Sequence, residues 1–231
     1  KSMLDRLVSQ KTKLNVYFSL NSLAVLMAFI VSWRAFLFFS GYIFMIWFYS
    51  HKIKKYPIIG NLMSALLAVT PFFAILLYFY NKISFEEIEN HMSHFVVISA
   101  HAVFLFLLLL IREMIKDLEN LKGDLVSDYR TIPVLYGEKI SKQIITGLTL
   151  STILPVYVLV NIYDVGYMDI YFYVCFGVLL FFLIYLWKSD SKEQYLRLHN
   201  VLKFLIVSGV CCIVLINPSV LWHGRELISN Y

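Results

Sequence analysis

The sequence lacks the motifs by which most soluble enzymes are identified. It contains no P-loop, no GxGxxG pattern and no Ser/His/Asp constellation. No solenoid repeat, low-complexity tract or linker is present, so we expect a single domain over residues 1–231. Cysteine is also scarce, and Cys175, Cys211 and Cys212 lie in apolar runs without zinc-site spacing or the even number of a disulfide framework. We interpret these three as packing residues.

Charge is scarce as well. Asp, Glu, Lys and Arg make up 15% of the 231 residues, whereas 60% are hydrophobic and 17% are aromatic. With a mean hydropathy of +0.72, the chain is too apolar to cover the surface of a soluble domain. The sequence therefore predicts an integral membrane protein. Its net charge of +5 comes from basic residues dispersed among loops, which indicates membrane topology and not a nucleic-acid-binding surface.

Long apolar segments predict the fold class, which is all-α: a polytopic bundle of seven transmembrane helices. The segments cover residues 14–32, 35–50, 57–80, 93–111, 144–162, 170–187 and 201–221. Most are long enough to cross about 30 Å of hydrocarbon, and the second only just.

The basic residues orient these segments. Of the 20 Lys and Arg residues, 17 fall in the connections on one side of the predicted membrane, and only Arg34, Lys82 and Arg225 fall on the other. Because Lys and Arg are enriched in cytoplasmic loops, we predict that the richer side is cytosolic. The chain would then start inside and end outside, as an odd number of crossings requires.

One predicted cytosolic stretch, residues 111–137, gathers carboxylates between two apolar segments. As a continuing helix at about 100° per residue, it places five side chains within about a quarter of a turn. This acidic stripe consists of Glu113, Asp117, Asn120, Asp124 and Asp128. The alternative is a solvated charged loop, since Gly123 and the turn-like Pro133 and Gly137 can break the helix before the stripe ends.

Carboxylates at helical spacing are hard oxygen ligands suited to Mg²⁺, which bridges to substrate phosphates while Lys and Arg neutralise the remaining charge. At a membrane surface, the stripe predicts a site for a lipidic diphosphate. A rival metal pair, His91 and His94, lies on the other side of the membrane. A solvated acidic loop explains this pair better than a metal site does.

Three stretches resemble the UbiA family of intramembrane prenyltransferases, and together they run over nearly the whole chain. REMIKDLENLKGDLVSDYRTIPVLYG resembles the family's second acid-rich motif, of the form KDxEDxxGDxxxxxxTLPVxxG. FYSHKIKKYPIIGNLMSALL is similar to its segment with Lys before Pro and the Gly-Asn-Leu that opens the next helix. YLRLHNVLKFLIVSGV is similar to its last-helix pattern.

The resemblance implies a bundle of nine helices with a lateral opening for the polyprenyl tail and the acceptor. The seven segments would be helices 3–9 of that fold. The family's first motif, NDxxDxxxD, belongs before residue 1, and nothing in the chain replaces it. We expect an N-terminally incomplete enzyme, inactive as this fragment, with a naturally short partner protein as the alternative.

The resemblance also assigns the metal ligands. Asp117 and Asp124 match acidic positions of the second motif, which implies that they bind Mg²⁺ at the diphosphate and are the catalytic residues. Asn120 stands where the family commonly has Asp, so it can offer one oxygen but no charge. Asp128, which stands where many members have Gly, is the fourth candidate ligand.

Five further residues are candidates for substrate binding: Tyr49, Lys54, Asn61, Arg130 and Lys203. Lys54 and Arg130 would contact phosphate, although the positive-inside rule alone also explains each. The ring of Tyr49 would face an allylic cation, or would simply lie at the membrane interface.

The implied function is Mg²⁺-dependent transfer of a polyprenyl group from its diphosphate to a lipophilic acceptor. The phrase REMIKDLENLKGD favours a geranylgeranyl donor and a glycerol phosphate lipid acceptor, with an aromatic quinone precursor or a haem-type acceptor as rivals. We expect membrane lipids as further partners and no nucleic acid. The predicted location is the bacterial inner membrane, with the active site facing the cytosol.

The alternative function class is a non-enzymatic transporter or binding subunit with an acidic cytosolic vestibule. Transporters usually place ionisable residues near the middle of the membrane. The apolar segments here are almost free of charge between their ends, which favours the enzyme.

Overall fold

The structure is a computed structural model that describes residues 9–53, 56–80, 88–127, 129–163 and 165–212. Every regular element of these residues is a helix, which confirms the all-α class. The elements are α2 (Gln10–Val31), α3 (Trp33–His51), α4 (Pro57–Tyr80), α5 (Ile88–Val126), α6 (Ile132–Ser151), α7 (Ile153–Tyr157), η3 (Val158–Ile162), α8 (Met168–Lys188) and α9 (Lys192–Cys212).

These elements make the seven predicted crossings, because α6, α7 and η3 follow one another along a single interrupted span. Six of the crossings are long and apolar enough to span a membrane. The seventh, α3, covers the segment that the sequence showed to be barely long enough. Part of the last predicted segment, residues 213–221, lies outside the described residues.

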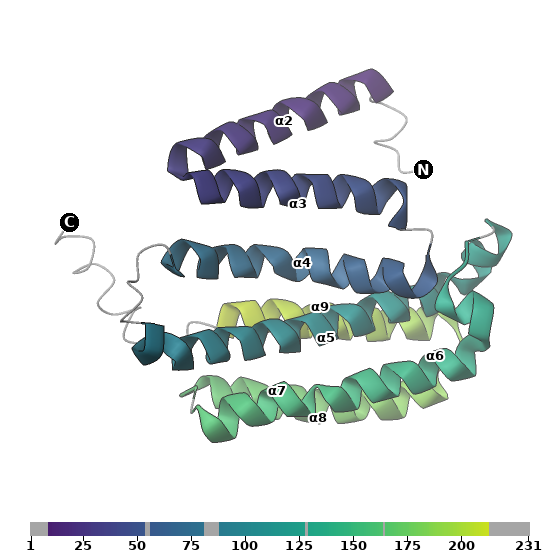
Figure 1. The fold of residues 1–231 in the computed structure, drawn as a ribbon. Coiled ribbons are helices and arrows are strands. Elements are labelled where there is room, and N and C mark those ends of the chain that lie inside the picture. Colours follow the sequence, from purple (N-terminus) through teal and green to yellow (C-terminus); the bar gives the residue numbers. More distant parts are fainter. Residues whose placement is uncertain (1–8, 54–55, 81–87, 128, 164, 213–231) are drawn as a thin grey trace.

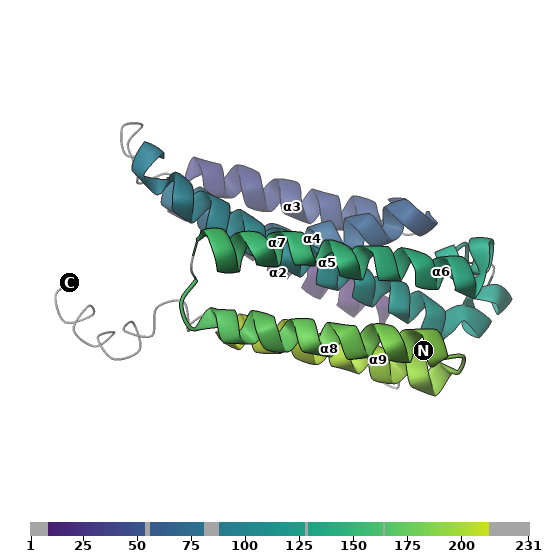
Figure 2. The ribbon, with the colours of Figure 1, turned by 90° about the horizontal axis from the view of Figure 1, so that it is seen from below.

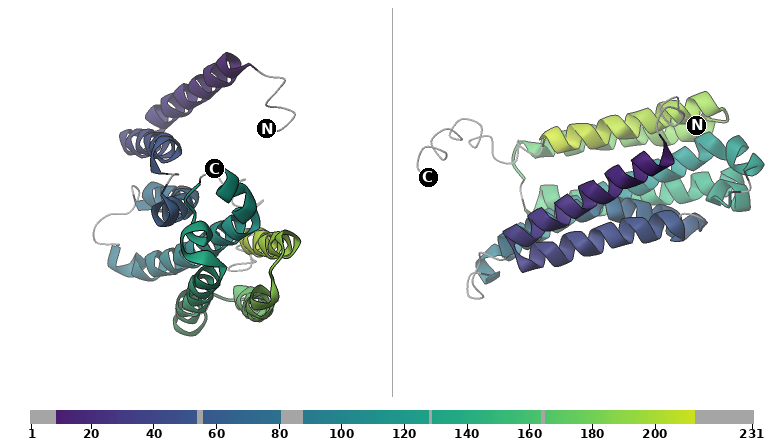
Figure 3. Two further views of the ribbon diagram at one scale, coloured as in Figure 1. Left: turned by 90° about the vertical axis from the view of Figure 1, so that its right-hand side faces the viewer. Right: turned by 90° about the horizontal axis from the view of Figure 1, so that it is seen from above.

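The helices lie side by side in two groups that meet at α5. On one side, α4, α3 and α2 follow in order outward from α5 and form the α2–α4 layer (Figure 1). On the other side, α6 to α9 pack with α5 into the α5–α9 bundle, with α8 beside α9 (Figure 2). Viewed along the helices, α2 and α3 lie farthest from this bundle (Figure 3).

The main hydrophobic core belongs to the α5–α9 bundle. It includes Phe104 and Ile111 of α5, Phe172 of α8 and Leu202 of α9, all buried. A smaller cluster joins α4 to α5 around Ala65. The bundle is therefore the packed part of the molecule, and α4 is attached to it along one side of α5.

Polar side chains explain two sharp connections. Ser32 ends α2 and caps α3, because its Oγ accepts a hydrogen bond from the backbone N–H of Ala35 at 3.0 Å. Gln194 accepts hydrogen bonds from the backbone N–H groups of Asp190 and Ser191 at 2.8 and 3.0 Å, as in a capping box. This box starts α9 at Lys192, well before the predicted segment at residue 201.

Helix α5 is much longer than a membrane crossing. Its 39 residues span about 58 Å at 1.5 Å per residue, and its apolar part ends at Ile111. We call residues 112–126 the α5 extension. The helix continues through Gly123 and ends at Val126, so it carries the stripe as far as Asp124 and breaks before the stripe ends at Asp128, as the alternative interpretation allowed.

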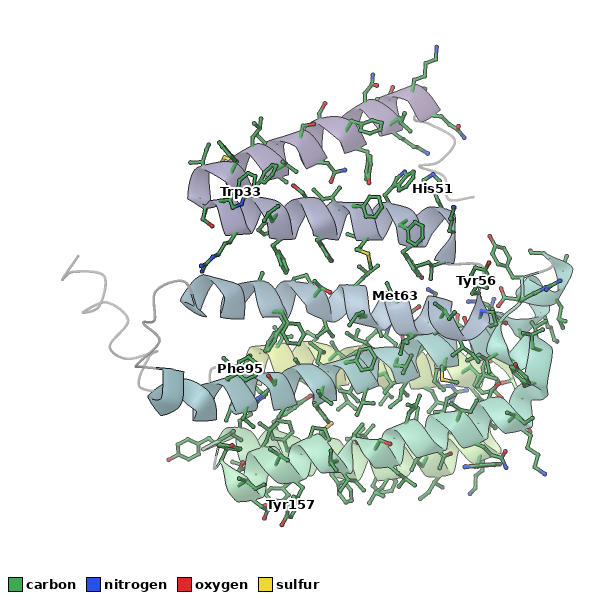
Figure 4. The ribbon with its side chains drawn as sticks, in the orientation of Figure 1. Trp33, His51, Tyr56, Met63, Phe95 and Tyr157 are labelled. Atoms are coloured by element: carbon green, nitrogen blue, oxygen red, sulfur yellow. The ribbon has the colours of Figure 1, made fainter. Side chains whose placement is uncertain are left out.

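The α5 extension lies at one end of the bundle, here called the charged end. His51 and Tyr56 lie at the same end, whereas Trp33, Phe95 and Tyr157 lie at the opposite end (Figure 4). The connections between α3 and α4, α5 and α6, and α8 and α9 all fall at the charged end (Figures 1 and 2). This alternation agrees with the loop-charge pattern, and the cytosolic assignment of the charged end stays a prediction.

Candidate active site

The acidic stripe lies on the side of α5 that faces α4. In the apolar part of the helix, Ala102 and Leu109 belong to the cluster with Ala65 of α4. At about 100° per residue, the stripe continues that same side of α5 as far as Asp124. The carboxylates therefore extend the α4–α5 interface beyond the apolar part of the bundle.

A hydrogen bond joins two of the predicted site residues across this interface. Asn61, near the start of α4, donates from Nδ2 to Oδ2 of Asp117 at 2.7 Å. Both side chains are partly buried. The Gly-Asn-Leu of α4 and the acidic stripe of α5 therefore meet at one site.

The surroundings of Asp117 make its carboxyl easier to protonate than a free one when no cation is present. Burial raises the pKa of Asp117 to about 6, the hydrogen bond from Asn61 opposes this rise, and the charges of Asp124 and Glu113 add to it. Burial also raises the pKa of Asp124. Two partly buried carboxylates with raised pKa values on one helical face favour a positively charged ligand, because such a ligand offsets the cost of burying their charge.

Asn120 lies on the same face between these two carboxylates. Its Nδ2 donates to the backbone carbonyl of Lys116 at 3.0 Å. The amide nitrogen is thus bound to its own helix, and the amide oxygen is left as the group that can accept or ligate. Asp128, the last residue of the predicted stripe, lies outside the described residues.

The profile of the UbiA prenyltransferase family matches residues 3–206. The chain belongs to this family. Its membership agrees with the helical membrane fold.

Curated relatives carry one name. The chain is 28% identical over 197 residues to the digeranylgeranylglyceryl phosphate synthase of Thermococcus sibiricus, an alignment that covers 83% of this chain and 64% of that protein. It is 33% identical over 153 residues to the synthase of the same name from Pyrococcus horikoshii, an alignment that covers 64% of this chain and 49% of that protein. It is 26% identical over 171 residues to the synthase of Methanobrevibacter smithii, which covers 69% of this chain and 55% of that protein. The chain thus spans less than two thirds of these relatives' lengths, and no solved structure matches it significantly.

The other predicted substrate contacts are not joined to the stripe. Lys203 is exposed on α9 and Arg130 is exposed between α5 and α6, and neither forms an ion pair with another described residue. Tyr49 is half-buried on α3. Lys54 lies outside the described residues. The roles of all four stay predictions.

Sequence reasoning missed a buried pair that holds the α5 extension against α9. His199 Nδ1 lies 3.0 Å from Oε2 of Glu119, and the two side chains are 9% and 13% exposed. The helical period carried the signal, because Glu119 lies two residues from Asp117 and hence on nearly the opposite side of α5. This pair faces the bundle while the stripe faces α4.

A second missed contact closes the charged end of the bundle. Lys142 of α6 is buried, and its Nζ donates to the backbone carbonyl of Ser189 at 2.6 Å and to Oδ1 of Asp190 at 3.1 Å. Its burial could not be read from the sequence, where it counted as one more basic loop residue. The contact ties α6 to the turn between α8 and α9.

Proposed function

We propose that the protein transfers a geranylgeranyl group from its diphosphate to a prenylated glycerol phosphate lipid, and that this transfer requires Mg²⁺. The hydrogen bond between Asn61 and Asp117 carries the proposal, because it brings two motifs of the family together at the charged end. The names of the relatives support the donor and the acceptor.

The side chains fit a Mg²⁺ ion that also binds a diphosphate. Asp117 and Asp124 would supply carboxylate oxygens and Asn120 an amide oxygen, all hard ligands. Among the described residues no three His, Cys, Asp or Glu side chains converge as a complete metal centre. A site of this kind suits Mg²⁺, which keeps waters and takes ligands from substrate phosphates. When bound, the ion would neutralise charge on the departing diphosphate.

The chain's own residues position the reaction. Asn61 holds the carboxylate of Asp117 in one orientation, and the apolar helices exclude water from the prenyl chain. The bond between C1 of the prenyl group and the diphosphate oxygen breaks, and its electron pair leaves with diphosphate. An oxygen of the acceptor's hydroxyl group then bonds to C1 and releases its proton.

The test uses the full-length protein in liposomes with geranylgeranyl diphosphate. Transfer is measured as prenylated product with a prenylated glycerol phosphate, with an aromatic quinone precursor, or with no acceptor. We expect product only with the glycerol phosphate lipid, loss of product after chelation, and recovery with added Mg²⁺. Product with the aromatic acceptor alone would replace our acceptor, and solute uptake without any product would support the transporter alternative.

A further inference from the structure

Two cations at the start of the α5 extension share one carboxylate. Arg112 Nη2 lies 3.2 Å from Oε1 of Glu113, and Lys116 Nζ lies 3.4 Å from Oε2 of the same residue. The three groups therefore carry one positive charge in excess. This cluster adjoins the stripe, since the charges of Glu113 and Lys116 both act on Asp117.

Arg112 has an unused donor. Its Nε is buried and has no hydrogen-bond acceptor among the described residues, while its side chain is 29% exposed. A buried donor on a charged group without an acceptor is costly. The guanidinium favours bidentate contact with phosphate or carboxylate, so the arrangement fits an anionic ligand.

The depth of Arg112 suits the phosphate of a lipid. It follows Ile111, the last residue of the apolar part of α5, so it lies where the hydrocarbon region gives way to the interface. Asp117 lies about 7.5 Å further along the helix axis at 1.5 Å per residue. An acceptor that has its tails in the membrane would bring its phosphate to Arg112 before it reached Asp117.

We propose that Arg112, assisted by Lys116, binds the phosphate of the glycerol phosphate acceptor. This inference rests on the proposed function and adds how the acceptor is recognised. Glu113 holds one edge of the guanidinium, and the acceptor phosphate takes the remaining donors. The Arg112 side chain reaches Glu113, a member of the acidic stripe, so the acceptor phosphate would lie beside the stripe that holds the donor diphosphate.

The test compares full-length wild type with Arg112→Gln, Arg112→Lys and the control Lys122→Gln. Lys122 is an exposed cation of the same helix on another side. Transfer is measured with a prenylated glycerol phosphate and with the same lipid lacking its phosphate, and KM is determined for acceptor and donor separately. Direct binding of the radiolabelled glycerol phosphate lipid is measured without donor.

We expect Arg112→Gln to raise the KM for the phosphorylated acceptor by a factor of about ten to a hundred, as for loss of a charge-assisted phosphate contact. The KM for the donor should change less than about twofold. The preference for the phosphorylated lipid over the lipid without phosphate should fall by the same factor as the acceptor KM rises. Arg112→Lys should recover part of the affinity, because the positive charge remains but the planar guanidinium that binds phosphate with two donors is lost. Lys122→Gln should match wild type.

A rise in donor KM of the same size would place Arg112 at the diphosphate and overturn the inference. Equal acceptor KM values in wild type and Arg112→Gln would also overturn it. If neither wild type nor any variant transfers a prenyl group, the proposed function fails. The binding measurement then decides the inference alone. Retained binding of the glycerol phosphate lipid by wild type and its loss in Arg112→Gln would sustain it, whereas equal or absent binding would not.

Discussion

Helices α2 and α8 are both apolar and both long enough to cross a membrane, yet they are packed very differently. Only Ala28 is buried in α2, and α3 has no buried residue. In α8, seven residues are buried, among them Phe172, Cys175 and Leu186. Apolar composition therefore identifies a crossing but does not tell a lipid-facing helix from a core helix.

Close approach makes the difference, since both regions have a tyrosine hydroxyl that donates to a backbone carbonyl of the next helix. In the α2–α4 layer, Tyr42 of α3 donates to the carbonyl of Leu67 of α4 at 3.0 Å. Tyr171 of α8 donates its hydroxyl to the backbone carbonyl of Leu205 at 2.9 Å, beside Gly209 of α9. Lipid supplies no hydrophobic force between helices, so contacts of this kind hold them together. In the α2–α4 layer the α2–α3 contact includes the ring pair of Phe29 with Phe36. The candidate site lies where the two regions meet, and Asn61 is the residue that the layer contributes.

Removing the bundle's principal carboxylate should have the largest effect. We expect Asp117→Ala to lower prenyl transfer on the order of 10³-fold, because the charge that holds the cation at the diphosphate is lost. The protein should still elute as wild type in size-exclusion chromatography. Glu193→Ala, at an exposed acid of α9, is the control and should retain activity. Full activity of Asp117→Ala would remove the stripe from the site.

A pair of glycine variants compares the packing of the two regions. A Cβ at Gly209 would lie 2.5 Å from the Tyr171 hydroxyl, whereas a Cβ at Gly41 of α3 would meet nothing within 4 Å. Gly209→Ala should destabilise the protein by about 1 to 3 kcal/mol, because Tyr171 must move away from its hydrogen bond. Gly41→Ala should be neutral or stabilising by up to about 1 kcal/mol from helix propensity.

Thermal unfolding in detergent measures both glycine variants. Equal unfolding midpoints for Gly209→Ala and wild type would show that α8 and α9 can move apart at Gly209 without loss of stability. A destabilised Gly41→Ala would show that α3 packs against a surface that the described residues do not contain.

The sequence predicted the crossings because membrane spans need long apolar runs, and it predicted the acidic stripe because α5 continues as a helix. It missed the early start of α9, whose signal is the short capping box at Ser191 and Gln194. It also missed the partners of Asp117 on one side and of Glu119 on the other. Helical spacing gives the direction of a side chain but does not say which helix lies there.

The contact between the two regions should set the pH dependence of metal use. Mg²⁺ binds only the ionised carboxylate, so the half-saturating Mg²⁺ concentration should rise as the pH falls through about 6, the pKa of Asp117 in the empty site. Asn61→Ala removes a hydrogen bond that lowers this pKa. In this variant the half-saturating Mg²⁺ concentration should therefore begin to rise at a higher pH than in wild type. At a pH near that pKa we expect a difference from wild type of about threefold to tenfold.

Magnesium titrations of prenyl transfer on either side of this pKa measure the effect. Asn161→Ala, an exposed amide of η3 at the opposite end, should follow wild type at every pH. Superimposed curves for Asn61→Ala and wild type would mean that the layer does not act on Asp117 and that only the bundle forms the site.

An effect of similar size is expected at Asn120, which the motif resemblance sets at a position where the family commonly has Asp. Asn120→Asp adds a carboxylate between Asp117 and Asp124, which raises affinity for a hard divalent cation. The half-saturating Mg²⁺ concentration should fall by up to about tenfold, equivalent to about 1.4 kcal/mol. The new carboxylate cannot make the hydrogen bond that Asn120 donates to the Lys116 carbonyl, and this loss offsets part of the gain in affinity.

Asn120→Leu has neither charge nor oxygen and should raise the half-saturating Mg²⁺ concentration. Because bound metal already assists diphosphate departure at saturation, the maximal rate should change less than the affinity in both variants. Three coincident titrations would show that the amide oxygen points away from the cation and that Asn120 is not one of its ligands.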